Sequence, residues 1–432
     1  MRRASAVLLA ALLVAGGVVI ADTQNPPATM RLAAIEATGL RRLTAADVIA
    51  GSGLRVGSTV TLADIDASVD RLGKTGLFTH VSYRYRYKGT DLVVTFEVEE
   101  ARAETPVVFD NFPWFSDAEI VTAVAKAVPG FTTHISDNAE GIDRITAALD
   151  QMLRARKLPG RVEYIPYLDT RNGSHAHLFK VTGVSSPICD VMFSGVEPAL
   201  LAQVRNQVAP LLRRDYSRIG AMDFLRGTLV PFYRHLGHLR VQLSGLTARM
   251  GEAPSACAGG VVVAVPVEEG AVYWWKGAVW AGAQALNPRE MDAALGMKDG
   301  EVADGTKIDR GIRAVTTAYG RKGYLTARLA PTPQFEDLSH TVVFAIQIVE
   351  GPQFRMGELA ITGVPEATER RLRECWKLKA GGVYDAGYAT DFMNDLRKTD
   401  PQLLSGLGQM RMSVKQDTAT HIVHVILTFG PA

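Results

Sequence analysis

Residues 31–100 are RLAAIEATGLRRLTAADVIAGSGLRVGSTVTLADIDASVDRLGKTGLFTHVSYRYRYKGTDLVVTFEVEE, and this stretch decides the fold. Thr44 with Asp47, and Thr61 with Asp64, have the spacing of a capping box. In that motif a hydroxyl and an acid satisfy the free amides at the start of a helix. The stretch therefore predicts two helices, each with a defined beginning.

The same stretch predicts a small sheet around these helices. Apolar residues recur at helical spacing in the second helix and give it one buried face: Leu62, Ile65, Val69 and Leu72. An apolar strand over residues 32–37 precedes the helices, and the alternation over residues 81–98 predicts a hairpin after them. Because a lone hairpin is marginally stable, we expect the two helices to cover one face of a three-stranded mixed sheet. One strand edge is then left to solvent.

The rest of the chain repeats this β-α-α-β-β order. Closing positions recur about 80 residues apart, which is the signature of a tandem array: Glu100, Gly183, Gly270, Gly351 and Gly430. The sequence has 432 residues, which is more than one hydrophobic core accommodates. We predict an α+β chain of five small tandem domains over residues 31–100, 105–183, 187–270, 271–351 and 352–430.

Residues 1–21 have the order of a secretory signal peptide. Arg2 and Arg3 precede an apolar run that ends in the small residue Ala21. We expect cleavage after this run and export of the mature chain. The run is at the lower length limit for a membrane span, so an uncleaved inner-membrane anchor is the alternative.

The chain has three cysteines, an odd number for an exported protein. Cys189 lies in the first predicted strand of the third unit and Cys257 lies before its last strand. A disulfide between them is feasible in an oxidising compartment and leaves Cys375 alone. The alternative is three small buried side chains, because spacing in the sequence does not fix disulfide geometry.

No sequence pattern indicates catalysis, a cofactor or a metal. The close histidine pairs, His175 with His177 and His421 with His424, have no cysteine or clustered carboxylate beside them, and exposed strand histidines explain them. The sequence has no phosphate loop, nucleophile elbow or dinucleotide fingerprint. A net charge of +2 argues against nucleic acid. We expect a protein that is not an enzyme.

The fourth unit resembles the POTRA family, the polypeptide-transport-associated domains of barrel-assembly and two-partner-secretion outer-membrane proteins. Residues 319–324, YGRKGY, are similar to the family's step from the second helix to the second strand, and residues 349–351, VEG, are similar to its closing turn. Related pairs recur in the first and third units. The second unit fits loosely, and the fifth lacks the glycine-aromatic step at residues 403–405 and the closing acid.

Five such domains resemble the periplasmic arm of the central barrel-assembly protein. We expect no transmembrane barrel here, because no row of alternating ten-residue segments follows. The resemblance implies a periplasmic scaffold or chaperone-like module that binds unfolded outer-membrane proteins or barrel-assembly subunits. It would act in a Gram-negative-type envelope and reach the outer membrane through a partner. One alternative is an inner-membrane-anchored docking protein of the division or envelope machinery. Another is a subunit that completes a separately encoded barrel.

The resemblance makes the second strand of each unit a free sheet edge, which can bind a guest strand by β-augmentation. In the third unit this strand is expected over residues 238–244: His238, Leu239, Arg240, Val241, Gln242, Leu243 and Ser244. Backbone amides would bind the guest, so proline at Val241 or Gln242 should abolish capture. The aromatic residues Trp274 and Trp275 are the alternative binding surface, and core packing also explains them.

Overall fold

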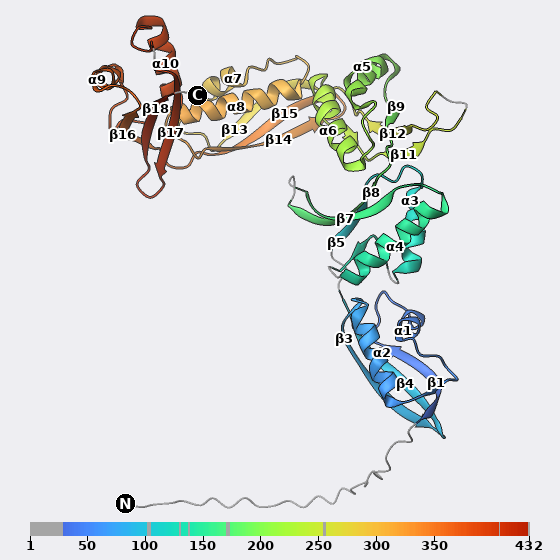
Figure 1. Ribbon diagram of the computed structural model, residues 1–432. Helices are drawn as coiled ribbons and strands as arrows, with labels where there is room; N and C mark the ends of the chain where they lie inside the picture. The colour runs from blue at the N-terminus through green and yellow to red at the C-terminus, as the bar shows by residue number, and fades with distance from the viewer. Residues whose placement is uncertain are drawn as a thin grey trace, which may run out of the picture. The chain divides into compact units, whose positions relative to one another are not determined.

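The computed structural model describes residues 29–101, 105–128, 131–136, 139–169, 173–253, 256–405 and 407–430. Within these residues the chain forms ten α-helices and five small β-sheets (Figure 1). It packs as two compact bodies, one from the described parts of residues 1–109 and 117–184, the other from those of 110–116 and 185–432. The predicted signal peptide lies outside the described residues.

The first sheet contains both a parallel pair and an antiparallel hairpin. Its elements are β1 (Met30–Thr38), α1 (Ala45–Ser52), β2 (Thr59–Val60), α2 (Leu62–Lys74), β3 (Phe78–Lys88) and β4 (Asp91–Glu100). The central strand β4 runs parallel to β1 and antiparallel to β3. Both predicted capping boxes are present, at Thr44 and Thr61. The core between helices and sheet includes Leu32, Ile65 and Phe96, all fully buried.

The second sheet repeats this arrangement. Its elements are β5 (Thr105–Phe109), α3 (Asp117–Ala127), β6 (His134–Ile135), α4 (Ala139–Ala155), β7 (Arg161–Asp169) and β8 (Ser174–Thr182). The strand order β6-β5-β8-β7 matches the order β2-β1-β4-β3 of the first sheet. The apolar stripe of α4, which includes Ile145, Leu149 and Leu153, is buried. Helical periodicity alone therefore identifies the covered face.

The third sheet has an irregular outer strand. Its elements are β9 (Ile188–Ser194), α5 (Pro198–Val208), the 3-10 turn η1 (Ala209–Leu211), α6 (Arg218–His235), β10 (Gln242–Leu243), β11 (Thr247–Met250) and β12 (Val261–Glu268). Leu243 pairs with Val267 and Thr247 pairs with Ala264, so one extra residue separates β10 from β11. The two strands thus form a single edge interrupted by a bulge, where Gly245 has a φ of 155°.

The fourth and fifth sheets are regular. The fourth unit comprises β13 (Trp274–Ala281), α7 (Pro288–Leu295), α8 (Gly305–Arg321), β14 (Arg328–Glu336) and β15 (Thr341–Val349). The fifth comprises β16 (Arg355–Thr362), α9 (Glu366–Cys375), α10 (Tyr388–Thr399), β17 (Gln409–Asp417) and β18 (Ile422–Gly430). In both, the last strand lies in the centre, parallel to the first strand and antiparallel to the second. The predicted α+β fold of small mixed sheets with paired helices is confirmed, whereas the boundaries of five separately folding domains stay a prediction.

A carboxylate at the end of the central strand ties three of the sheets to the loop that follows their first strand. Glu350 accepts the amides of Gln284 and Ala285 at 2.7 and 2.8 Å. Glu100 accepts three loop amides in the first sheet, and Glu269 accepts one in the third. The closing acid of the sequence motif is therefore a structural residue that caps loop amides.

Candidate functional site

The strand predicted over residues 238–244 is wrong in its bounds. Only Gln242–Leu243 (β10) lies in the sheet there, and residues 238–241 form turns after α6. The physical reason is that Gly237, with a φ of 91°, turns the chain back after the helix before it reaches the sheet. The amide of Val241 donates to the carbonyl of His238 at 3.3 Å. Proline at this position would therefore remove a turn bond and no outward donor.

Two of the predicted edge residues, Leu239 and Arg240, instead contact the fourth unit. The ring of His238 is buried, and Leu239 packs against the core beneath β13 and β15. The Arg240 guanidinium lies 4.1 Å from the ring centroid of Phe335, and its Nη1 is 3.0 Å from Oδ1 of Asp337. The side chains of Leu239 and Arg240 therefore join the third unit to the fourth. Binding of a partner by residues 238–244 stays a prediction.

The geometry of the outer strands decides which edges can accept a guest strand. In a β-strand, residues whose side chains point to one face also direct their amides to one edge. In β14, Pro331 and Pro333 pair with the buried residues Ile346 and Phe344. A strand tolerates proline where its missing amide would face away from the sheet. Residues opposite the buried side chains of a central strand therefore direct their amides outward.

The third sheet independently shows that residues of the outer strand opposite buried side chains direct their amides outward. Met250 of β11 pairs with the buried Val261. Its amide donates to the carbonyl of Pro113, at 3.1 Å, which lies outside the sheet. This outward donor is therefore already used by the segment 110–116, which packs with the third unit.

Three of the five outer strands offer an incomplete row of outward donors. β14 lacks the amides of Pro331 and Pro333, in consecutive outward positions. β7 lacks one at Pro166, which pairs with the buried His177. β11 has its Met250 amide bonded to the carbonyl of Pro113. A guest strand would lose hydrogen bonds at each of these edges.

The outer strands β3 and β17 keep complete rows. In β3 the outward amides belong to Val81, Tyr83, Tyr85 and Tyr87, which pair with buried residues of β4. In β17 they belong to Met410, Met412 and Val414, which pair with buried residues of β18. In the part of the chain that the structure describes, no acceptor bonds these amides. These two edges are the candidate binding site.

The side chains along both edges add exposed apolar surface. On β3, the ring centroids of Tyr83 and Tyr85 are 6.4 Å apart, and those of Tyr85 and Tyr87 are 6.1 Å apart. Tyr85 and Tyr87 are 43% and 49% exposed. On β17, Met412 and Val414 are 39% and 40% exposed. The alternate side chains of an added strand can therefore pack on these rows.

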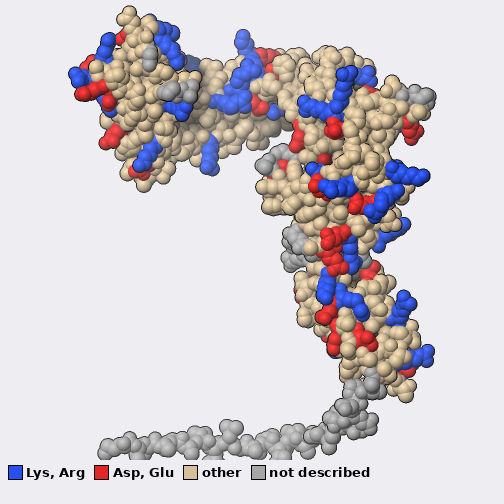
Figure 2. Space-filling model, viewed as in Figure 1, with Lys and Arg blue, Asp and Glu red and all other residues tan. Residues whose placement is uncertain are grey.

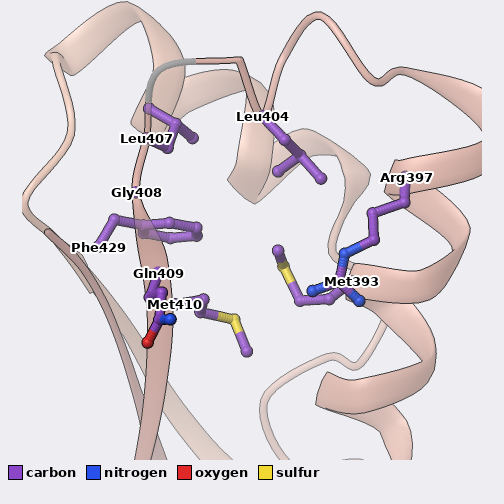
Figure 3. Close-up of a pocket in the computed structure, with 8 residues that line it drawn as sticks. All are labelled: Met393, Arg397, Leu404, Leu407, Gly408, Gln409, Met410 and Phe429. Carbon is purple, nitrogen blue, oxygen red and sulfur yellow. The ribbon is translucent and has the colours of Figure 1, made fainter. Parts of the chain in front are cut away.

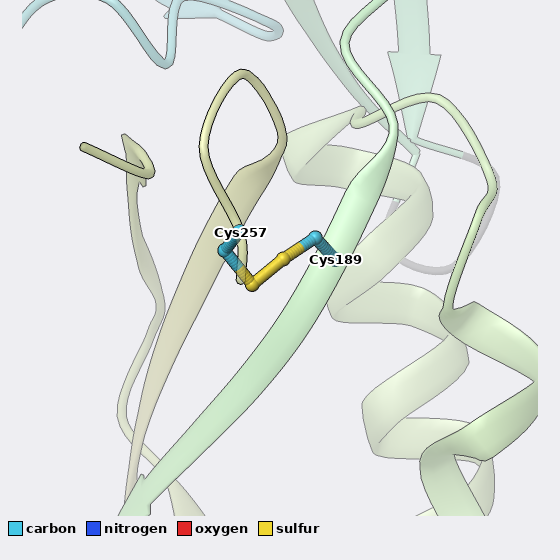
Figure 4. Close-up of a disulfide and its surroundings, with 2 residues drawn as sticks. All are labelled: Cys189 and Cys257. Atoms are coloured by element: carbon cyan, nitrogen blue, oxygen red, sulfur yellow. A yellow bond between two sulfur atoms is a disulfide. The ribbon is translucent and has the colours of Figure 1, made fainter. Parts of the chain in front are cut away.

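A disulfide links the first strand of the third sheet to the loop between its outer and central strands. Cys189 of β9 is bonded to Cys257, with the two Cα atoms 5.7 Å apart (Figure 4). The bond anchors the loop that follows β11 to the first strand of its own sheet. Cys375, in α9, is a free thiol.

The described residues show mixed charge and no metal-binding cluster. No group of three His, Cys, Asp or Glu among them has the geometry to hold a metal ion. Basic and acidic side chains are intermixed on the face shown in Figure 2. No helix within the described ranges is long and apolar enough to span a membrane. Of the predicted aromatic alternative, Trp275 is buried and Trp274 is 44% exposed.

The repeated β-α-α-β-β order and the open outer strands define a class of small tandem modules built around mixed sheets. Residues 276–351 match the family model of POTRA, described as a surface antigen variable number repeat. The matched range includes most of β13 and all of α7, α8, β14 and β15. The chain therefore contains a POTRA domain, and the resemblance seen at residues 319–324 is confirmed.

A known protein is similar in sequence to part of this chain. A protein of Treponema pallidum (strain Nichols), named "Putative outer membrane protein assembly factor", is 21% identical over 218 residues. The match covers 50% of this chain and 26% of that relative, so the chain spans about a quarter of the relative's length.

Solved structures with similar folds are also known. POTRA domains 3–5 of Haemophilus influenzae BamA match at 15% identity and a TM-score of 0.42, covering 57% of this chain and 96% of theirs. POTRA domains 1–3 of Omp85 from Anabaena match at 18% identity and a TM-score of 0.27, covering 58% and 97%. Because these TM-scores are low, the family assignment rests on the match of residues 276–351.

Proposed function

We propose that this protein is a non-enzymatic periplasmic scaffold that binds unfolded outer-membrane proteins, or subunits of their assembly machinery, by β-augmentation. The POTRA match and the relative named as an outer membrane protein assembly factor support a role in the assembly of outer-membrane proteins. The observation that carries the binding mode is the complete row of outward amides on β17, with a second row on β3.

An added strand would bond to the backbone and would not require one client sequence. Each backbone hydrogen bond contributes about 1 kcal/mol net, so a short row gives weak and reversible binding. Packing of client side chains on Met412 and Val414 adds apolar burial. Weak binding of alternating apolar segments suits a client that is passed on to the membrane.

The variant Met412→Pro tests the edge of β17. Met412 pairs with Leu427 as Pro331 of β14 pairs with Ile346, so a native strand already holds proline in this place. We therefore expect the variant to fold and to lose an outward donor. Met412→Ala is the matched control, because it removes the side chain and keeps the amide.

The measurement is capture of an unfolded barrel-strand peptide by the purified full-length chain. Tyr85→Pro makes the equivalent change on β3, because Tyr85 also directs its amide outward. Each proline variant should weaken capture, and the double variant should abolish it while circular dichroism stays unchanged. A folded double variant that binds like the parent would refute β-augmentation at these edges.

A further inference from the structure

In the third and fourth units, an aromatic ring packs at the turn between the second helix and the outer strand. The rings of His238 and Tyr233 meet edge to face with their centroids 5.6 Å apart. Tyr324 meets Tyr319 in the same way at 6.1 Å. Tyr233 and Tyr319 lie on the buried faces of α6 and α8. In each of these two units, a ring from the unit's own residues therefore fills the corner between the second helix and the outer strand.

The fifth unit has Ser405 at the corresponding position. Met410 pairs with Phe429 as Leu329 pairs with Ile348, and both partners are the last buried residues of their central strands. Ser405 lies as many residues before Met410 as Tyr324 lies before Leu329. The side chain at this position is small and exposed. The fifth unit therefore has no ring at this position, although Phe429 of β18 lines the corner.

A pocket of about 430 Å³ opens at this corner (Figure 3). Its apolar lining comes from α10, from the loop after it and from the two strands: Met393, Leu404, Leu407, Met410 and Phe429. Figure 3 shows Phe429 and Met410 on one side and Met393 on the other, directed toward the space between them. Because Met410 lies on the outer strand, the pocket is at the open edge of the sheet.

Arg397 adds a positive charge to the lining of this pocket. Its side chain is exposed, and its Nη1 donates to Oδ1 of Asn394 at 2.9 Å. Within the described residues no carboxylate forms an ion pair with it, whereas Arg321 of α8 pairs with Asp391. The pocket thus combines an apolar interior with a guanidinium whose charge is not neutralised.

We propose that the guest strand supplies the missing ring. A strand added to β17 would lie about 4.8 Å from it, which places guest side chains directly beside Met410. An aromatic side chain fits the apolar corner, where thioethers of Met393 and Met410 make favourable contacts with a ring. An acidic side chain on the same guest strand would pair with Arg397. This inference rests on the proposed function, because it uses the open edge of β17.

The test uses a short synthetic peptide of alternating Thr and Val that carries one Phe and, two positions away, one Glu. Its binding to the full-length chain is measured by fluorescence anisotropy, next to peptides with Phe→Ala, Phe→Leu or Glu→Gln. Phe→Ala should weaken binding about tenfold, since a large buried side chain is lost. The Phe→Leu peptide should fall between the two.

Two protein variants locate the effect. Ser405→Tyr returns a ring to the corner and should remove the preference for Phe over Ala. Arg397→Gln should weaken binding of the Glu peptide by up to about fivefold and leave the Gln peptide unchanged. If Ser405→Tyr does not fold, the Phe, Leu and Ala peptides on the parent chain decide the requirement for a ring, and the Arg397→Gln comparison decides the acidic contact.

The outcomes separate this inference from the proposed function. Equal affinity for the Phe, Leu and Ala peptides overturns the pocket assignment and leaves β-augmentation standing. Leu bound as tightly as Phe overturns the requirement for a ring. If no peptide binds the parent chain, both the pocket and the binding edge are refuted.

Discussion

Replacement of Glu350 by alanine should destabilise the fourth unit selectively. Its carboxylate accepts the amides of Gln284 and Ala285, and the hydroxyl of Tyr319 lies beside it. A hydrogen bond to a charged group contributes about 1.5–3 kcal/mol, and the freed loop amides regain part of this by bonding to water. We expect the free energy of unfolding to fall by about 3 kcal/mol. For a unit of this size that corresponds to roughly 15 °C in Tm.

The effect of Glu350 should depend on pH in a defined direction. Burial opposes ionisation of this carboxyl, but the amides of Gln284 and Ala285 and the hydroxyl of Tyr319 hold its pKa below the ordinary value of 4.5. A group whose pKa is lowered by folding stabilises the folded state above its unfolded pKa. The contribution is therefore complete above about pH 4.5 and is lost as the pH falls further. Glu350→Ala should have a flatter pH dependence in this window.

Hydrogen exchange of the Gln284 and Ala285 amides gives a local readout, and urea unfolding gives the free energy. Asp299→Ala is the matched control, because it removes an exposed acid from a turn of the same unit. If Glu350→Ala unfolds at the same urea concentration as the control, the carboxylate does not hold the loop. Unchanged exchange at both amides would lead to the same conclusion.

Two further changes test the cores of the fourth and third units. Tyr319→Ala removes a ring that is fully buried and should lower stability by about 3 kcal/mol, with limited proteolysis then cutting first within residues 271–351. Cleavage spread evenly over the chain would instead show that the units unfold together. The double change of Cys189 and Cys257 to alanine opens a loop of 68 residues and should lower stability by about 4 kcal/mol, seen as a lower urea midpoint. A midpoint equal to that of the oxidised parent would contradict a stabilising role for the disulfide.

Local signals in the sequence were sufficient for most of the fold. The capping boxes at Thr44 and Thr61 fix helix starts within a few residues, so they need no tertiary information. The same holds for Asn287, which caps α7 by bonding the amide of Glu290 at 3.0 Å. The alternation of β14 and β15 likewise specifies a hairpin. Such elements are decided by contacts between residues close in sequence.

The outer strand of the third sheet could not be placed in this way. Its position depends on the turn at Gly237, on a bulge at Gly245 and on the contacts of Arg240 with the fourth unit. None of these leaves a periodic pattern. The aromatic segment 110–116 is a similar case, because Asp110 accepts the hydroxyl of Ser217 at 3.0 Å from a distant part of the chain.

The open edges could be predicted only in part, because they depend both on residues visible in the sequence and on strand pairing visible only in the structure. Pro331 and Pro333 are visible in the sequence, but only the pairing with β15 shows that they remove outward donors. The missing ring near Ser405 is also visible in the sequence. The pocket that results is not, because it depends on how Met393 and Phe429 meet across the corner.

The prolines of β14 also bear on how copies of this protein behave toward one another. An edge with free amides pairs with the edge of a second copy as readily as with a client. β14 lacks two such donors, whereas the outward amides of β3 and β17 have no acceptor in the described chain. Under the proposed function, a client and a second copy would therefore compete for the same hydrogen bonds. Concentrated protein without clients should be its most aggregation-prone state, and bound client should act as its solubiliser.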